Sequence, residues 1–310
     1  MKKALSVAAL VVALTGSALA ADLPSYKAPP PPPLPPPPLW TGFYVGLNAG
    51  GTWANSNSVT TGVAPIATIG DFPHGGGAAQ QASYLGAMAL TTSGTVPING
   101  GGFIGGGQIG YNWQFWGGRL VAGVEADIQG VAGSGSSKTL GTLAPVTVPQ
   151  NAGEAYVGGI SSTKRLDYIG TVRGRLGWLF TPTLLVYGTG GLAYGGVQTS
   201  TSVFNANTVL CCNHLPPIFG ASAFSDTRVG WTAGAGLEWM FMPNWSAKVE
   251  YLYYDLGTVN AAFFIPAVDN VTGFQAFFAG QTRARFNGNI VRAGVNYHFN
   301  WGAAPIVAKY

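Results

Sequence analysis

From Trp40 onward, the chain alternates apolar and polar residues with a period of two, and this pattern is its strongest constraint on the fold. The first such segment carries Phe43, Val45 and Leu47 on one face, with mostly glycine and polar residues on the other. Successive side chains of a strand point to opposite faces, so the alternation predicts β-strands. Similar segments follow near residues 103–115, 120–129, 166–180, 184–198, 229–241, 247–253 and 291–299.

Composition indicates where the apolar faces point. Only 8% of the residues are charged and 47% are hydrophobic, whereas a soluble domain carries about 25% charged residues. A membrane-spanning helix needs roughly 20 consecutive apolar residues, and no such run follows residue 20. A closed barrel lets strands span lipid without exposing a polar edge. We therefore predict an all-β chain, an eight-stranded antiparallel transmembrane β-barrel with apolar residues outward and polar residues in the lumen.

The connections between these segments alternate in length. Short turns fall at Gly117-Gly118, at 181–183 and at 242–244, and long links cover roughly 55–101, 133–163, 200–225 and 257–284. Short periplasmic turns and long outer loops are typical of outer-membrane barrels, so the pattern predicts four long outer loops.

The two termini differ from the barrel region. Residues 1–20 combine Lys2 and Lys3, an apolar run and small residues before Ala21, which predicts a secretory signal peptide. Residues 21–39 are rich in proline and predict an extended periplasmic tether, with an arm that binds the cell wall or a protein as the alternative. The barrel is predicted over 40–299, and 300–310 form a C-terminal extension. Lys2 and Lys3 would be removed with the predicted signal peptide. The net charge of the remaining chain therefore gives no indication of nucleic-acid binding.

Charged residues on the lumen faces are predicted to meet at one depth of the barrel. Counting from the short turns places Glu238 opposite Lys248 and brings acids and bases of neighbouring strands to similar heights. The predicted layer consists of Glu125, Asp127, Arg173, Arg175, Glu238, Lys248, Glu250 and Arg292. Unpaired charges there would cost several kcal/mol, so we expect pairing. The layer is either an ionic core that fills the lumen, which we favour, or a gate for small solutes; reversing Lys248 to Glu should lower stability or raise conductance.

Few other residues suggest chemistry. Cys211 and Cys212 are adjacent in a long loop, and a vicinal disulfide and free or intermolecular thiols both stay open. With His214 they lack a fourth ligand, so we predict neither a metal site nor a cofactor. A barrel enzyme would need a histidine near the outer rim, whereas His298 is predicted to face the lumen at the periplasmic end. No catalytic residue is predicted.

Several consecutive motifs resemble those of one family. They are Trp40–Gly46, Arg173–Gly177, Tyr187–Tyr194, Lys248–Gly257 and Val291–Phe299. Together, over about residues 40–299, they resemble the RopB-type outer-membrane surface proteins of alphaproteobacteria, small barrels related to the OmpA transmembrane domain and often labelled porin family. The resemblance implies a final strand whose aromatic end, here Tyr297 and Phe299, is recognised by the barrel-assembly machinery. The extension after Phe299 departs from that pattern.

The resemblance and the pattern together predict an integral outer-membrane barrel with a structural role in the envelope and a role in surface contact. A small-solute porin with a narrow or gated lumen is the alternative, and a barrel enzyme is a weaker one. The expected partners are outer-membrane lipid, lipopolysaccharide and the assembly machinery, with the cell wall or a host surface as further candidates. The oligomeric state stays open.

Overall fold

A computed structural model describes residues 39–72, 77–147, 154–208 and 216–299. The predicted signal peptide, nearly all of the tether and the C-terminal extension lie outside the described residues, as do Cys211, Cys212 and His214. The predictions made for those segments therefore stay predictions.

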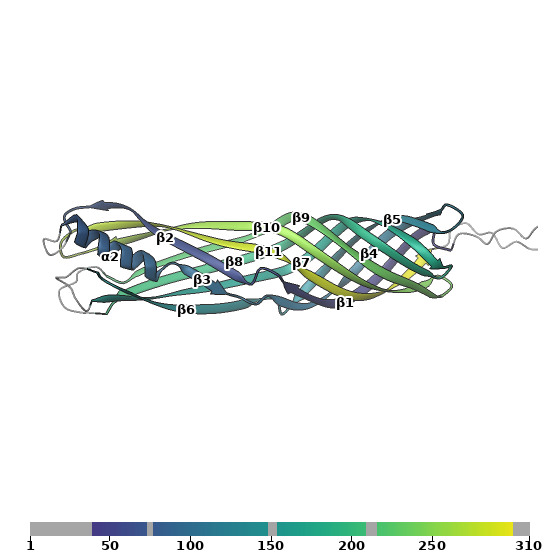
Figure 1. The fold of residues 1–310 in the computed structure, drawn as a ribbon, viewed down its shortest axis with the longest axis horizontal. Coiled ribbons are helices and arrows are strands. Elements are labelled where there is room, and N and C mark those ends of the chain that lie inside the picture. The colour runs from purple at the N-terminus through teal and green to yellow at the C-terminus, as the bar shows by residue number, and fades with distance from the viewer. Residues whose placement is uncertain (1–38, 73–76, 148–153, 209–215, 300–310) are drawn as a thin grey trace, which may run out of the picture. The chain divides into compact units, whose positions relative to one another are not determined.

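Eight antiparallel strands form a closed ring (Figure 1). The ring pairs β1 with β4 and continues through β5, β7, β8, β9 and β10 to β11, which pairs back onto β1. The strands are β1 Gly42–Ala54, β4 Gly101–Phe115, β5 Leu120–Ala132, β7 Ala155–Thr181, β8 Leu184–Asn207, β9 Ile218–Met242, β10 Trp245–Val268 and β11 Gln275–Phe299. The predicted eight-stranded antiparallel barrel is confirmed.

The short turns set the register of the hairpins. Phe115 lies opposite Leu120 and Trp113 opposite Ala122, as the alternation predicts. Gly117 and Gly118 both adopt positive φ, at 63° and 81°, which glycine tolerates without a steric penalty. We call the part of the barrel nearer these short turns the turn half, and the part nearer the long connections the loop half.

Among the described residues, three of the four long connections are largely strand, and the first combines two strands with a helix. β7 to β11 continue well beyond the predicted segments, and three more strands extend the wall: β2 Ser58–Ile69, β3 Gly94–Pro97 and β6 Ser136–Pro145. β2 pairs with β11, β3 with β2, and β6 with β7. Frequent serine and threonine weaken the contrast between the two faces of these strands, which is why the alternation did not reveal them.

The helix α2, Ala78–Thr91, lies between β2 and β6 in the loop half (Figure 1). It buries Tyr84, Leu85 and Met88, and the Asn205 side chain of β8 donates to the Met88 carbonyl at 3.1 Å. The helix thus covers the opening between the β2–β3 and β6–β7 edges. In the described part of the chain, no helix is long and apolar enough to cross a membrane.

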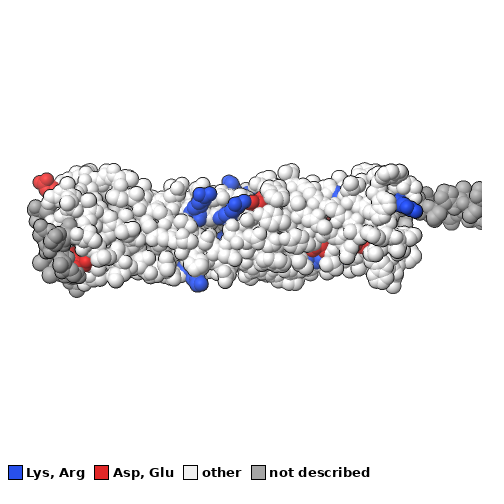
Figure 2. Space-filling view, viewed as in Figure 1, with Lys and Arg blue, Asp and Glu red and all other residues white. Residues whose placement is uncertain are grey.

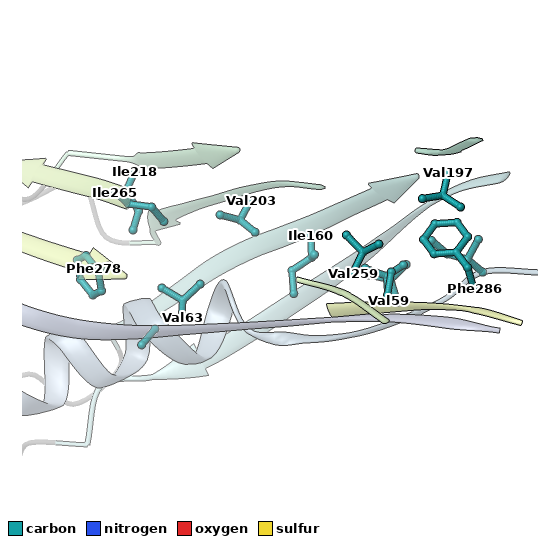
Figure 3. Packing of buried hydrophobic residues seen from close by; sticks show 14 of the residues in the cluster. Val59, Val63, Ile160, Val197, Val203, Ile218, Val259, Ile265, Phe278 and Phe286 are labelled. Atoms are coloured by element: carbon teal, nitrogen blue, oxygen red, sulfur yellow. The ribbon is translucent and has the colours of Figure 1, made fainter. Parts of the chain in front are cut away.

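The interior of the loop half is a hydrophobic core (Figure 3). It is built from every wall strand of this half and from α2, and the labelled members are Val59, Val63, Ile160, Val197, Val203, Ile218, Val259, Ile265, Phe278 and Phe286. The long connections therefore fold as a packed extension of the barrel.

Irregularities in β7 and β10 reverse which side chains face inward. The pairing of β7 with β8 shifts between Leu166 and Tyr168. The alternation predicts Leu166 outward and Asp167 inward, and this is wrong: Leu166 is buried in the core, and Asp167 pairs with the exposed Arg165. A β-bulge inserts one residue into the two-residue period, so the faces exchange above it.

Candidate functional site: a charged layer in the lumen

The eight charged residues of the predicted layer all lie inside the turn half, on five strands. β5 supplies Glu125 and Asp127, β7 supplies Arg173 and Arg175, and β10 supplies Lys248 and Glu250. Glu238 of β9 and Arg292 of β11 complete the set. Every one is at most 5% exposed. Salt bridges join all eight into one connected network.

Arg173 lies at the centre of this network. Its Nη2 donates to Glu125 and, at 2.9 Å, to Asp127 Oδ2. Its Nη1 donates to Glu250 Oε1 at 2.9 Å. A β-carbon at Gly191 of β8 would lie only 2.7 Å from the Arg173 Cα, so glycine permits the close strand approach beside this arginine.

Arg292 shares two carboxylates with Arg173 from the other side of the lumen. Its Nη2 donates to Asp127 Oδ2 at 2.8 Å, and its Nε donates to Glu250 Oε2 at 2.8 Å. β5 and β11 are separated by β1 and β4 in the ring, so the Arg292–Asp127 contact crosses the barrel, whereas Glu250 lies directly opposite Arg292 on the neighbouring β10.

Lys248 also contacts a distant strand. It lies opposite Glu238 in the register, as predicted. Its ammonium, however, extends to Glu125 of β5, with 3.0 Å from Nζ to each carboxylate oxygen. Glu238 accepts instead from Arg175 Nη2 at 2.7 Å and from Asn296 Nδ2 at 2.7 Å. Long side chains in a narrow lumen reach partners that strand pairing does not specify.

Two tyrosines complete the layer and were not singled out from the sequence. Tyr44 donates to Glu125 Oε2 at 2.7 Å, and Tyr187 donates to Glu250 Oε1 at 3.1 Å. The Arg175 guanidinium lies 4.6 Å from the centre of the Tyr187 ring and 5.2 Å from that of Tyr44. Tyr44 alternates with Phe43 and Val45, so its inward position could have identified it, whereas the faces of the Tyr187 strand were ambiguous.

Four carboxylates face four cationic side chains, so the layer is formally neutral. Removing charges from water is costly unless each finds a partner of opposite sign and hydrogen bonds. The network meets this requirement through bonds that span the lumen in several directions. It is therefore a cross-linked filling of the barrel interior.

The turn-side end of the lumen is filled by Trp40. This residue is fully buried beside Val121, Leu179, Leu185 and Met240. Its Nε1 donates to the Pro182 carbonyl at 2.9 Å, and its ring meets that of His298 edge-on with 5.7 Å between centroids. Trp40 lies four residues before Tyr44, so a period of two places both side chains on the lumen face. This spacing could have identified Trp40 from the sequence.

His298 lies at the lumen end predicted for it. It is 2% exposed, and its Nε2 is 2.9 Å from the Ser246 hydroxyl. Tyr297, its neighbour in β11, faces outward between the rings of Trp245 and Phe299, at 5.2 and 5.1 Å. Phe299 ends β11 and lies opposite Phe43 of β1. Within the described ranges, no group of three or more His, Cys, Asp or Glu side chains is placed to hold a metal ion.

The outer wall of the turn half is apolar. Aromatic residues near the short turns are exposed, namely Trp178, Phe180, Trp239, Phe241 and Trp245. A second aromatic group, with Trp53, Trp231 and Tyr253, lies at the other edge of the apolar wall. Two aromatic girdles that flank an apolar band are the signature of a barrel in a bilayer.

Comparison with known proteins agrees with this geometry. The chain is 35% identical over 299 residues to the 31 kDa outer-membrane immunogenic protein of Brucella melitensis, covering 96% of this chain and all of that protein. It is 34% identical to the 22 kDa outer membrane protein of Rhizobium leguminosarum bv. viciae, covering 48% of this chain and 52% of that protein.

A solved structure similar to this chain is the outer membrane protein OprG of Pseudomonas aeruginosa, with a TM-score of 0.34 and 10% identity, covering 84% of this chain and 97% of that one. The family described as the outer membrane protein beta-barrel domain matches residues 6–299. Located in the outer membrane like its relatives, the chain belongs to the outer membrane protein beta-barrel domain family.

Proposed function

We propose that this barrel is closed to solutes and serves as a structural component of the outer membrane, with its loop half presented at the cell surface. The observation that carries the proposal is the continuous filling of the lumen. Trp40 fills the turn-side end, the charged layer follows, and the hydrophobic core with α2 fills the loop half.

The energetics of the layer support closure. A solute that crossed the lumen would have to separate Arg173 or Arg292 from their shared carboxylates. Leaving a buried charge without its partner costs about 3–5 kcal/mol, and several such contacts would have to open together. Closed side-chain packing is also what an eight-stranded barrel accommodates, since its interior is just wide enough for side chains.

The surface role is supported by the loop half and by the relatives. The Brucella relative is named an outer-membrane immunogenic protein. By analogy, the packed loop half of this chain offers a stable surface to the exterior. We further propose that lipopolysaccharide surrounds the barrel, and that the assembly machinery recognises Tyr297 and Phe299 at the end of β11.

A catalytic role has little support. Among the described residues, the one histidine is His298, buried at the turn side against Ser246 and Trp40. A substrate that approaches from the cell exterior would meet the hydrophobic core first. We propose that the protein is not an enzyme.

Conductance measurements test the closed lumen. We expect the refolded full chain to insert into planar bilayers and show no steady channels. Lys248→Glu adds a fifth carboxylate to the layer, beside Glu125 and Glu250, so it should loosen the layer and give frequent openings. The matched control is Lys138→Glu, the same reversal at an exposed site of β6. Steady openings of the unmodified chain would overturn the proposal and favour a narrow porin.

A further inference from the structure

The Lys and Arg residues outside the charged layer are unevenly distributed. In the described part of the chain, one of them, Arg119, lies at a short turn. The others form what we call the basic band: Lys138, Lys164, Arg165, Arg228, Arg283 and Arg285. Figure 2 shows lysine and arginine atoms gathered near the middle of the long axis, between two largely uncharged stretches of surface.

Contacts place the members of the band at one height. The buried Lys164 ammonium of β7 donates to the Arg285 carbonyl of β11 at 2.5 Å. Arg228 Nη2 of β9 donates to the Thr258 carbonyl at 3.4 Å, and Thr258 lies opposite Arg285. Lys138 of β6 lies opposite Ser162, two residues from Lys164. The band therefore includes strands from several sides of the barrel.

The band carries an excess of positive charge. Three acids lie among its six bases: Asp167 pairs with Arg165 at 2.7 Å, Asp255 pairs with Arg285 at 2.6 Å, and Asp226 is exposed near Arg228. The paired arginines still expose more than half of their side chains, at 56% and 54%. Arg283 and Lys138 are exposed as well. Guanidinium groups are thus available to an anion that approaches from outside the wall.

The band lies at the edge of the apolar wall. On β9, Arg228 is followed by the outward-facing Val229 and Trp231, which are 67% and 52% exposed. On β7, Arg165 is followed by Tyr168 and then by Val172, which is 52% exposed. Aromatic side chains mark the headgroup level of a membrane. The excess positive charge therefore lies where the phosphate groups of the outer leaflet are found.

We propose that the exposed members of the basic band, Lys138, Arg165, Arg283 and Arg285, bind the phosphorylated headgroups of outer-leaflet glycolipid. Arginine suits this ligand because its planar guanidinium donates two parallel hydrogen bonds to a phosphate. A basic residue near an anionic membrane surface strengthens binding about fivefold. The inference depends on the membrane position of the barrel and is independent of whether the lumen conducts.

The test uses the full chain in phosphatidylcholine nanodiscs that contain a small fraction of lipid A. The probes are bisphosphorylated lipid A and the same lipid without phosphates, and native mass spectrometry counts the lipid retained by the barrel. We expect selective retention of the phosphorylated form. The variant Arg165→Gln, Arg283→Gln, Arg285→Gln should bind it on the order of a hundredfold more weakly, from three fivefold losses. The matched control Arg119→Gln, at the opposite end, should bind normally.

Three results would overturn the proposal: equal retention of the two lipids, undiminished binding by the triple glutamine variant, or tighter binding of soluble inositol hexakisphosphate than of lipid A in neutral detergent. The last result would assign the band to a soluble polyanion. A triple lysine variant at the same positions keeps the test valid if the glutamine variant does not fold. It preserves the charge and should retain most of the binding.

Discussion

The turn half and the loop half of this barrel have opposite polarity. In the turn half, charged residues such as Arg173 and Glu250 are buried inside, while Leu176 and Val249 are exposed outside. In the loop half, Ile160 and Phe278 are buried inside, while the exposed face of β8 carries Ser200 and Ser202. One continuous set of strands is therefore built for lipid along one part of its length and for water along the other.

The difference shows that the solvent, and not the strand geometry, determines which face of the barrel is apolar. A wall in contact with lipid places its apolar side chains outward, and the polar side chains that remain must satisfy one another in the lumen. A wall in contact with water buries its apolar side chains, as a soluble domain does. With the loop half at the cell surface, as proposed above, the level at which the polarity reverses corresponds to the outer edge of the membrane.

Local irregularities and charge coincide at that level. β7 shifts its register between Leu166 and Tyr168, and β10 between Asp255 and Thr258, where Gly257 adopts a φ of 81°. Each shift exchanges the inner and outer faces of its strand. The basic band lies at the same height. The β-bulges and the exposed arginines therefore both lie at the junction of the two halves.

Removing a central charge should destabilise the turn half strongly. Arg173→Met leaves Glu125, Asp127 and Glu250 with one fewer cation in a buried site. We expect the free energy of unfolding to fall by about 4 kcal/mol, because an uncompensated buried charge cannot be solvated. Urea titration of the barrel in lipid vesicles, followed by tryptophan fluorescence, measures this change.

The matched control is Arg165→Met, which removes an arginine from an exposed pair with Asp167. Exposed pairs contribute less than about 1 kcal/mol, so this variant should unfold close to the unmodified chain. Equal effects of the two substitutions would show that the charged layer contributes no more than a surface ion pair, and the contrast between the two halves would lose its energetic basis.

Creating a cavity in the loop half should give a smaller and more local effect. Met88 of α2 is fully buried in the hydrophobic core. Met88→Ala should cost about 3 kcal/mol, the usual loss for truncating a buried methionine. Because the turn half has its own interior, the loss should appear as faster proteolysis within the loop half, while the heat-modifiable shift of the barrel on gels persists.

Leu90 of the same helix is 67% exposed and provides the control. Leu90→Ala should leave the protease pattern nearly unchanged, because the methyl groups removed are already in contact with water. If Met88→Ala abolished the heat-modifiable shift altogether, the two halves would unfold as one cooperative unit. They would then differ in polarity but not in stability.

The turn half could be predicted from the sequence because lipid imposes strict alternation. The ring of eight strands, the register at Phe115 and Leu120, and the inward parity of Arg173 all follow from that period. Pairs on neighbouring strands, such as Glu250 and Arg292, follow from it as well, whereas the partners across the lumen could not be predicted. Lys248 reaches Glu125, 123 residues away and on a non-neighbouring strand, and no local pattern encodes this contact.

The loop half was less predictable for a different reason. Many of its outward residues are small or hydroxylated, such as Thr139 and Gly141 of β6 and Ser200 and Ser202 of β8, so these strands show weak contrast between their faces. α2 is rich in alanine and lacks a clear polar face. The inserted residue Asp167 also reverses which face of β7 points into the barrel. Counting every second residue past this insertion therefore assigns Leu166 to the wrong face.

Lys164 offers the finest test, because it lies at the boundary between the halves. Its ammonium donates to the Ser56 carbonyl at 2.7 Å and lies 5.0 Å from the centre of the Phe286 ring. Burial lowers the pKa of this amine from 10.5 to about 8. Between these two values the unfolded chain holds a proton that the folded chain has released, so stability should rise with pH.

From pH 8 to 9.5 this difference corresponds to a gain of about 1.5 kcal/mol in the free energy of unfolding. Lys164→Met has no amine to titrate, so the gain should disappear from urea titrations repeated across that range. Tyrosines and other lysines are common to both chains, so subtracting the two pH profiles isolates Lys164. If the difference in the free energy of unfolding between the two chains stayed constant or fell with pH, Lys164 would be in contact with water, and so would the boundary between the halves at this residue.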